Sequence, residues 1–176
     1  MANLEYYASA RWAVAEPGVI LLGKFDRAIQ QLIVLKEFYQ AGARFHHMVD
    51  KIKEFNQENT LERIFCPEKP EQFIRRFAGE DLPVWPLAYN EEMEKVAVSL
   101  TAEALERMIP DKGPGLAFSR ECTETIRQFA AYRVKVSDPN RPVIDRPQRV
   151  HHQTVEALHL LVLGLFNSPD YQVRWI

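Results

Sequence analysis

Proline and glycine interrupt this chain of 176 residues at points that limit where regular structure can form. Pro17 and Gly18 precede the first long apolar stretch, and Gly42 follows it. Residues 82–87 contain two prolines, and residues 113–115 read Gly-Pro-Gly. Proline lacks an amide donor and disfavours helical geometry in the residue before it, so helices must begin and end between these points.

Between these breaks, apolar residues recur at the spacing of helices that bury one face. The pattern predicts helices over residues 18–41, 45–55, 71–77, 91–108, 119–131 and 148–166. Strand-like patterns are confined to fragments at residues 82–87, 132–136 and 173–176. The sequence therefore predicts an all-α fold: a helical bundle of about five helices, in a single helical domain over residues 1–176, with a proline- and arginine-rich loop before the last helix.

The composition is that of a folded globular chain and disfavours several classes of protein. Hydrophobic residues make up 47% of the chain, charged residues 26%, and the formal net charge is −2. This balance disfavours a strongly basic protein that coats nucleic acid. No apolar run approaches the roughly 20 residues that cross a bilayer, and the first residues lack the pattern of a secretory signal. We expect no membrane partner.

The sequence shows neither a disulfide or zinc-binding pattern of cysteines nor a known catalytic motif. Cys66 and Cys122 are too few for a disulfide framework and lack the paired spacing of a zinc site, which fits a reducing, intracellular and cytoplasmic location. No nucleophile elbow, phosphate-binding glycine loop or dinucleotide-binding fingerprint is present. We therefore expect no enzymatic activity, no catalytic residues and no cofactor.

The last predicted helix carries a possible metal-binding face. His152, Glu156 and His159 lie at positions i, i+4 and i+7, and imidazole and carboxylate groups at this spacing can chelate a transition metal. Glu156 and His159 also match the Glu-x-x-His element of di-iron bundles, but the second copy that such a bundle needs is absent. The face lies opposite the apolar stripe, so we expect a solvated polar surface and keep a metal site only as an alternative.

Basic residues gather before the last predicted helix. Residues 120–149 carry seven basic and four acidic side chains, a local charge of +3 against −5 for the rest of the chain. Arginine can direct two hydrogen bonds onto one phosphate, so this loop is a candidate clamp for a phosphate backbone. The alternative is a solvated loop in which arginines pair with Asp138 and Asp145. The candidate RNA-binding residues are Arg133, Lys135, Arg141, Arg146 and Arg149.

Four short segments resemble a known family when they are taken in order. Ser9-Ala10-Arg11-Trp12-Ala13 precedes an acid and Pro17; Arg133-Val134 precedes Val136 and Asp138-Pro139; Arg149-Val150 precedes Thr154-Val155; and Phe166 precedes Val173 and Trp175. These segments, about a third of the chain, resemble the coat proteins of rod-shaped plant RNA viruses, the tobamovirus-like group. The resemblance implies a helical bundle that polymerises around single-stranded RNA, with Arg133 and Arg149 facing the RNA.

The chain departs from that family at several positions. His151 and His152 stand where the family tends to have carboxylates, and Asn167 stands where it usually has glutamate. Residues 61–108 hold a helix that does not align with the family.

The leading hypothesis is a self-assembling structural protein that forms a helical homo-oligomer and packages single-stranded RNA, located in the cytoplasm and in the virion. The first alternative is a small helical adaptor or subunit of a ribonucleoprotein or mobile-element complex. The second alternative is a metal-binding helical bundle that uses His152, Glu156 and His159.

Overall fold

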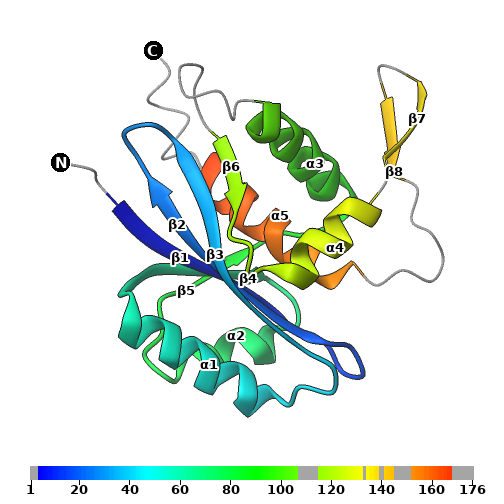
Figure 1. Ribbon diagram of the computed structural model, residues 1–176. Coiled ribbons are helices and arrows are strands. Elements are labelled where there is room, and N and C mark those ends of the chain that lie inside the picture. Colours follow the sequence, from blue (N-terminus) through cyan, green and yellow to red (C-terminus); the bar gives the residue numbers. More distant parts are fainter. Residues whose placement is uncertain (1–3, 107–114, 133, 139–140, 145–151, 168–176) are drawn as a thin grey trace.

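The computed structural model of the chain is an α/β structure, so the prediction of an all-α bundle is wrong. It describes residues 4–106, 115–132, 134–138, 141–144 and 152–167. A twisted six-stranded sheet crosses the centre, and helices cover both of its faces (Figure 1). The strands are β1 (Leu4–Arg11), β2 (Gly18–Asp26), β3 (Gln31–Gln40), β4 (Leu61–Pro67), β5 (Val84–Leu87) and β6 (Gly115–Phe118).

The strands are arranged in the order β5-β4-β1-β2-β3-β6. Consecutive strands β1, β2 and β3 pair antiparallel, whereas β4 joins β1, β5 joins β4 and β6 joins β3 in parallel. The first strand of the chain is therefore central in the sheet. It pairs antiparallel with β2 on one side and parallel with β4 on the other.

The largest error of the sequence prediction is the helix expected over residues 18–41, which is the hairpin of β2 and β3. Val19 and Leu21 point into one apolar core and Ile20 and Leu22 into the other, so both faces of β2 are buried. The sequence of a strand that is covered on both faces is an unbroken apolar run. Hydrophobic periodicity does not distinguish such a run from a buried helix.

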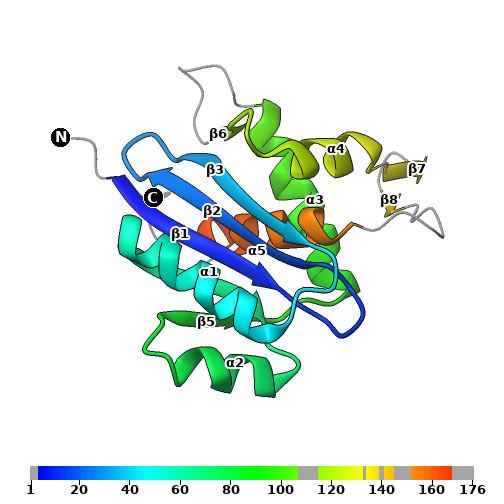
Figure 2. The same cartoon turned by 60° about the horizontal axis from the view of Figure 1, so that its bottom comes forward.

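Two helices cover one face of the sheet and three cover the other (Figures 1 and 2). On the first face lie α1 (Phe45–Glu58) and α2 (Glu71–Ala78), close to the predicted ranges. On the second lie α3 (Glu91–Glu106), α4 (Thr123–Ala131) and α5 (Gln153–Phe166). Asn90 caps α3, because its Oδ1 accepts a hydrogen bond from the Met93 amide at 3.0 Å.

The helix α5 lies across β1, β2 and β4 beneath α3 and α4, and it is buried nearly all round. His152 and His159 are 9% and 1% exposed, so the expectation of a solvated face on this helix is wrong. A helix that is covered on every side by the sheet and by other helices has no solvated stripe. Glu156, in its first turn, is half-buried rather than fully buried.

Aromatic residues near the N-terminus belong to the two cores. Tyr7 is 3% exposed and stacks on Phe65 with ring centroids 5.8 Å apart. Trp12 stacks on Phe73 at 6.2 Å and donates its indole N–H to the Ala43 carbonyl at 2.8 Å. Trp85 lies outside these cores: it is 45% exposed on β5, with the Arg63 guanidinium 4.0 Å from its ring centroid.

The region expected as a proline-rich loop contains a hairpin of β7 (Val134–Asp138) and β8 (Arg141–Ile144), which stands away from the sheet (Figure 1). The strand-like pattern at residues 173–176 lies outside the described residues. Within the described residues, no helix combines the length and the apolar character that a membrane span needs.

Candidate functional site

The most distinctive polar cluster lies at the edge of the sheet where β1 and β4 end. These two neighbouring strands are parallel, with Ser9 opposite Phe65 in register, so their carboxyl ends meet at one edge. In open α/β sheets, ligands bind at the carboxyl ends of parallel strands. The last residue of β1 is Arg11, and the first turn of α5 lies over it.

Arg11 joins two glutamates from distant parts of the chain. Its Nη2 lies 2.6 Å from Glu16 Oε2, and its Nε donates to Glu156 Oε2. The Arg11 side chain is 16% exposed and that of Glu156 is 24% exposed, so water weakens this ion pair less than it weakens surface pairs. Glu16 follows Ala15, whose φ of +64° places the turn after β1 in the left-handed region.

The position of Glu156 also follows from the helix. It is the acidic residue of the first turn of α5, where a carboxylate is favoured by the positive end of the helix dipole. The same turn is held by Gln128 of α4, whose Oε1 accepts hydrogen bonds from the amide and hydroxyl of Thr154 at 3.0 and 2.8 Å. These hydrogen bonds fix the first turn of α5 and, with it, the position of Glu156.

Ser9 lies two residues before Arg11, on the same face of β1 because side chains alternate along a strand. It is fully buried, and within the described part of the chain its Oγ makes no hydrogen bond. Buried hydroxyl groups are nearly always paired, so this one marks an incompletely satisfied polar position beneath the cluster.

The two histidines of α5 face a different group of side chains. His159 Nδ1 lies 2.9 Å from the Tyr89 hydroxyl, and the ring of Tyr132 lies 5.8 Å from His159 and 5.0 Å from His152. Burial lowers the pKa of His159 from 6.5 to about 4, so its imidazole is neutral at physiological pH. Among the described residues, no group of three or more His, Cys, Asp or Glu could hold a metal ion, and a site of His152, Glu156 and His159 is not supported.

The structure does not test the predicted phosphate contacts. Lys135 lies in β7 and Arg141 in β8, while Arg133, Arg146 and Arg149 lie outside the described residues. All five residues precede α5 in the chain, between α4 and the turn that carries Glu156. Their role as phosphate contacts stays a prediction.

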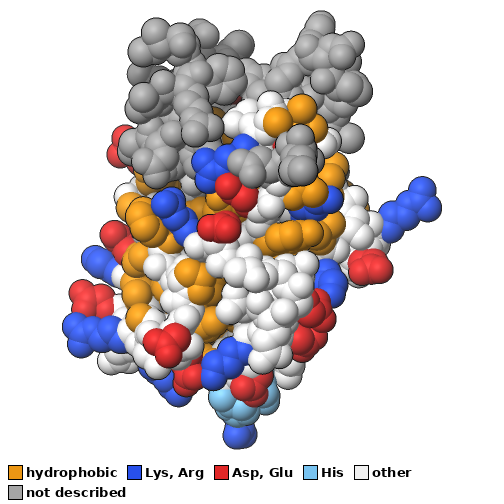
Figure 3. Space-filling model, turned by 90° about the vertical axis from the view of Figure 1, so that its left-hand side faces the viewer, with side chains coloured by type: hydrophobic (Ala, Val, Ile, Leu, Met, Phe, Trp, Pro, Cys, Tyr) orange, Lys and Arg blue, Asp and Glu red, His pale blue; other side chains and the backbone are white. Residues whose placement is uncertain are grey.

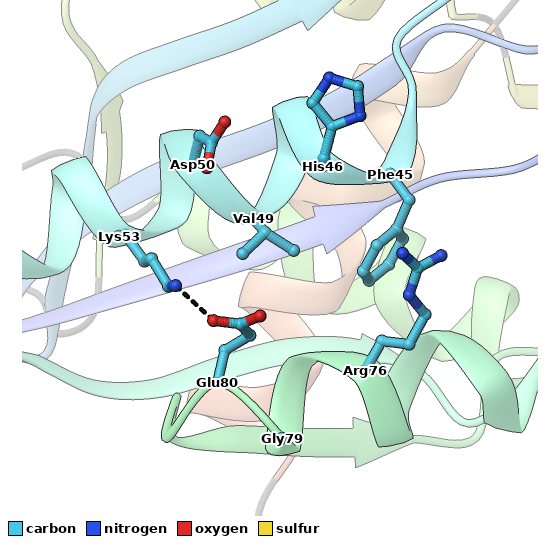
Figure 4. Close-up of a pocket in the computed structure, with 8 residues that line it drawn as sticks. All are labelled: Phe45, His46, Val49, Asp50, Lys53, Arg76, Gly79 and Glu80. Atoms are coloured by element: carbon cyan, nitrogen blue, oxygen red, sulfur yellow. Dashed lines mark hydrogen bonds and ion pairs between the residues drawn. The ribbon is translucent and has the colours of Figure 1, made fainter.

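A hollow of about 280 Å³ lies between α1 and α2 on the opposite face of the sheet (Figure 4). Its cationic groups are engaged within it: Lys53 pairs with Glu80, and the Arg76 guanidinium lies 4.2 Å from the Phe45 ring centroid. On the face shown in Figure 3, acidic and basic side chains are interspersed rather than segregated. Neither the hollow nor this face carries a concentrated charge that would select a ligand.

Comparison with known proteins identifies the fold. No protein-family model matches the chain, and no curated protein matches it in sequence. The large terminase of a thermophilic bacteriophage, solved in complex with ADP, is similar with a TM-score of 0.73 and 14% identity, over 93% of this chain and 40% of that protein. The large terminase nuclease of the thermophilic phage G20c has a TM-score of 0.68 and 13% identity, over 92% of this chain and 82% of that one.

The nuclease domain of the bacteriophage SPP1 large terminase, solved with bound Mn, is also similar, with a TM-score of 0.60 and 13% identity, over 90% of this chain and 85% of that one. The chain thus has the fold of terminase nuclease domains and spans about 40% of the length of the terminase solved with ADP.

These similarities overturn several expectations from the sequence. The resemblance to tobamovirus-like coat proteins is wrong, because the matched structures are terminase nucleases of a different fold class. A helical polymer around single-stranded RNA is not supported, and neither is a helical adaptor or a metal-binding bundle. The expectation that the chain is not an enzyme is overturned by the same finding, since the matched domains are nucleases.

The matched nucleases have been solved with cobalt, magnesium and manganese, so the residues here must be compared with the needs of such an ion. Hard divalent cations bind oxygen ligands, and Glu16 and Glu156 supply carboxylates. The guanidinium of Arg11 contacts both of them, however, and its positive charge repels a second cation from the two carboxylates. As they are arranged, these residues do not fit a divalent metal ion.

Sequence reasoning did not identify Arg11 and Glu16 as site residues. Arg11 and Glu156 are 145 positions apart, and no local pattern signals their contact. The helical spacing groups Glu156 with His152 and His159, whereas the structure turns those two histidines toward Tyr132.

Proposed function

We propose that this chain is a nuclease domain of the large-terminase type, acting on the phosphodiester backbone of DNA. The observation that carries the proposal is the shared fold over about nine-tenths of the chain with the G20c and SPP1 nuclease domains. The polar cluster at the carboxyl ends of β1 and β4 is the place where such a fold binds a ligand.

Within this centre we assign a role to each charged group. The guanidinium of Arg11 faces a phosphate oxygen and offsets the negative charge that builds up on the phosphoryl oxygens during attack by water. The carboxylate of Glu156, fixed at the start of α5, accepts a proton from that water. The water oxygen bonds to phosphorus while the bond between phosphorus and the oxygen of the departing strand end breaks, and that oxygen takes up a proton from solvent. Glu16 holds the guanidinium in place through its ion pair at 2.6 Å.

The arginine-rich segment supplies the remaining contacts in this proposal. Arg133, Lys135, Arg141, Arg146 and Arg149 bind the DNA backbone beside the centre, because they lie in the chain directly before the turn that carries Glu156. Contacts of this kind depend on charge and carry no base specificity. One matched terminase is recorded with ADP, so we also propose a nucleotide-binding partner segment, in place of a homopolymer.

The test is cleavage of supercoiled plasmid, measured with Mg²⁺, with Mn²⁺ and with EDTA. We expect the wild-type chain to nick the plasmid and Glu156→Gln to lower the rate by about 100-fold or more, as removal of a general base does. Glu71→Gln is the matched control, because Glu71 is exposed on α2, on the opposite face of the sheet. A wild-type chain that neither cleaves nor binds DNA under any of these conditions would overturn the proposal.

A separate measurement tests the basic segment. Replacing Arg133 and Arg149 together by alanine should weaken DNA binding and reduce the slope of log affinity against log salt concentration by about 2. Replacing Lys51 and Lys53 of α1 on the opposite face should leave the slope unchanged. An unchanged slope in the double arginine variant would remove this segment from the DNA-binding surface.

A further inference from the structure

Arg11, Glu16 and Glu156 form a centre, named here the Arg11 centre, that differs from a metal site in the nature of its cation. Two carboxylates from the turn after β1 and from α5 converge on one group, and that group is a side chain of the protein. We infer that Arg11 occupies the place of a divalent cation between Glu16 and Glu156, and that it excludes Mg²⁺ and Mn²⁺ from this centre in the wild-type chain. The inference deepens the proposed function and rests on it for its biological meaning.

Electrostatics explains why this place needs a cation. Two carboxylates that approach a common point repel each other, and a positive charge between them stabilises both in the ionised form. The Arg11 guanidinium provides that charge from a side chain that is mostly buried. A metal ion could enter only by displacing it from both carboxylates at once.

The backbone keeps Arg11 at this point. It belongs to the central strand β1 and pairs with Val19 of β2, so its Cα is fixed by the sheet rather than by a loop. Its side chain has two ion-pair partners on separate elements. Leaving the centre would break both of these ion pairs.

Ser9 gives an independent indication that the centre would accept a hydrated ion if Arg11 were absent. Its fully buried Oγ has no hydrogen-bond partner within the described residues, and it lies on the strand face that carries Arg11. A cation-bound water in the space of the arginine side chain would give this hydroxyl a partner. Mg²⁺ sites commonly use one or two carboxylates together with waters, so Glu16 and Glu156 suffice as protein ligands.

The experiment is a titration of each protein with Mn²⁺ in the absence of DNA, with free Mn²⁺ measured by electron paramagnetic resonance. We expect no stoichiometric binding to the wild-type chain and at least tenfold tighter binding of one Mn²⁺ to Arg11→Ala. Arg11→Lys retains the positive charge and should behave as the wild type does. Adding Glu156→Gln to Arg11→Ala should abolish the gain.

Two results would overturn the inference: a folded Arg11→Ala chain with no gain in Mn²⁺ binding, or a wild-type chain that binds one Mn²⁺ and loses it in Glu156→Gln. The second comparison does not depend on the folding of Arg11→Ala, which circular dichroism checks. Because DNA is absent, a chain without nuclease activity can still give the expected Mn²⁺ result, and then only the proposed function fails. If the wild-type chain cleaves DNA and its centre binds Mn²⁺, the inference fails and the proposed function stands.

Discussion

The carboxylate of Glu37, on β3, caps the first turn of α4 through Thr125: Oε2 accepts hydrogen bonds from the Thr125 amide at 2.8 Å and from its hydroxyl at 2.6 Å. The other oxygen accepts from the Glu124 amide at 2.7 Å. A residue of the sheet thus replaces the N-cap side chain of α4, because Cys122 at the N-cap position makes no capping hydrogen bond with its side chain. The first turn of helix α4 is therefore anchored to β3.

Replacing Glu37 by alanine should remove this anchor. Loss of a helix cap costs about 1–2 kcal/mol, so the free energy of unfolding should fall by that amount in urea titrations. Glu58→Ala is the control, because Glu58 forms an exposed ion pair with Lys36 and should unfold at nearly the wild-type urea concentration. If the two variants unfold alike, the carboxylate of Glu37 does not hold α4.

Protonation of His159 should make the stability depend on pH. The folded chain keeps this imidazole neutral down to about pH 4, whereas the unfolded chain takes up a proton near pH 6.5. Between these values the unfolded state binds more protons, so the free energy of unfolding falls as the pH falls, by about 3 kcal/mol in total. Urea unfolding at pH 7.5 and pH 4.5 measures the loss.

His159→Gln should reduce that pH dependence by the same amount, since glutamine does not titrate. His46→Gln is the matched control, because His46 is exposed on α1. If His159→Gln keeps the full pH dependence of the wild-type free energy of unfolding, that dependence comes from other titrating groups.

The two cysteines should be unreactive in the folded chain. Burial raises the pKa of Cys66 and of Cys122 to about 12, and the thiolate is the species that reacts with disulfide reagents. We expect negligible reaction with Ellman's reagent at pH 8 and reaction of both thiols in guanidinium chloride. Val14→Cys, at a residue that is 81% exposed, should add one fast-reacting thiol to the native protein. Fast reaction of the wild-type chain would contradict the burial of these thiols.

Gly164 should tolerate no side chain. A Cβ at this position of α5 would overlap the ring of Phe65, which is 1% exposed and stacked on Tyr7. Overpacking of this kind costs about 1–3 kcal/mol, so Gly164→Ala should lower the melting temperature. In Gly79→Ala the added Cβ would lie 3.4 Å from the Arg75 carbonyl oxygen, an ordinary contact, and that variant should melt at or slightly above the wild-type temperature.

Local patterns predicted the helices with one exposed and one buried face, and they failed where burial was complete. The helix expected over residues 18–41 rested partly on Phe25, Ile29 and Leu32 at helical spacing. Ile29 is 54% exposed in the turn between β2 and β3, next to Gln30 with a φ of +55°, so its spacing from the other two is a coincidence. In α4, the apolar Ile126 is 41% exposed, whereas the polar Thr125 and Gln128 are buried, so hydrophobicity alone does not indicate the inward face of this helix.

The candidate site could not be predicted for a different reason. Arg11 and Glu16 meet Glu156 only through the pairing of β1 with β2 and the packing of α5 on β1. Each of these residues lies in an ordinary sequence context. Information about their proximity resides in tertiary contacts, which one sequence does not display.

The packing of α5 against β1 also bears on when the protein can fold during its synthesis. The first strand leaves the ribosome long before the helix that covers it, as the 145-residue separation of Arg11 and Glu156 shows. Until Leu158, Leu161 and Leu165 have emerged, the apolar side of the sheet that they cover is exposed to water. Contacts of such long range form late and slowly, so the growing chain is prone to aggregation until α5 is complete.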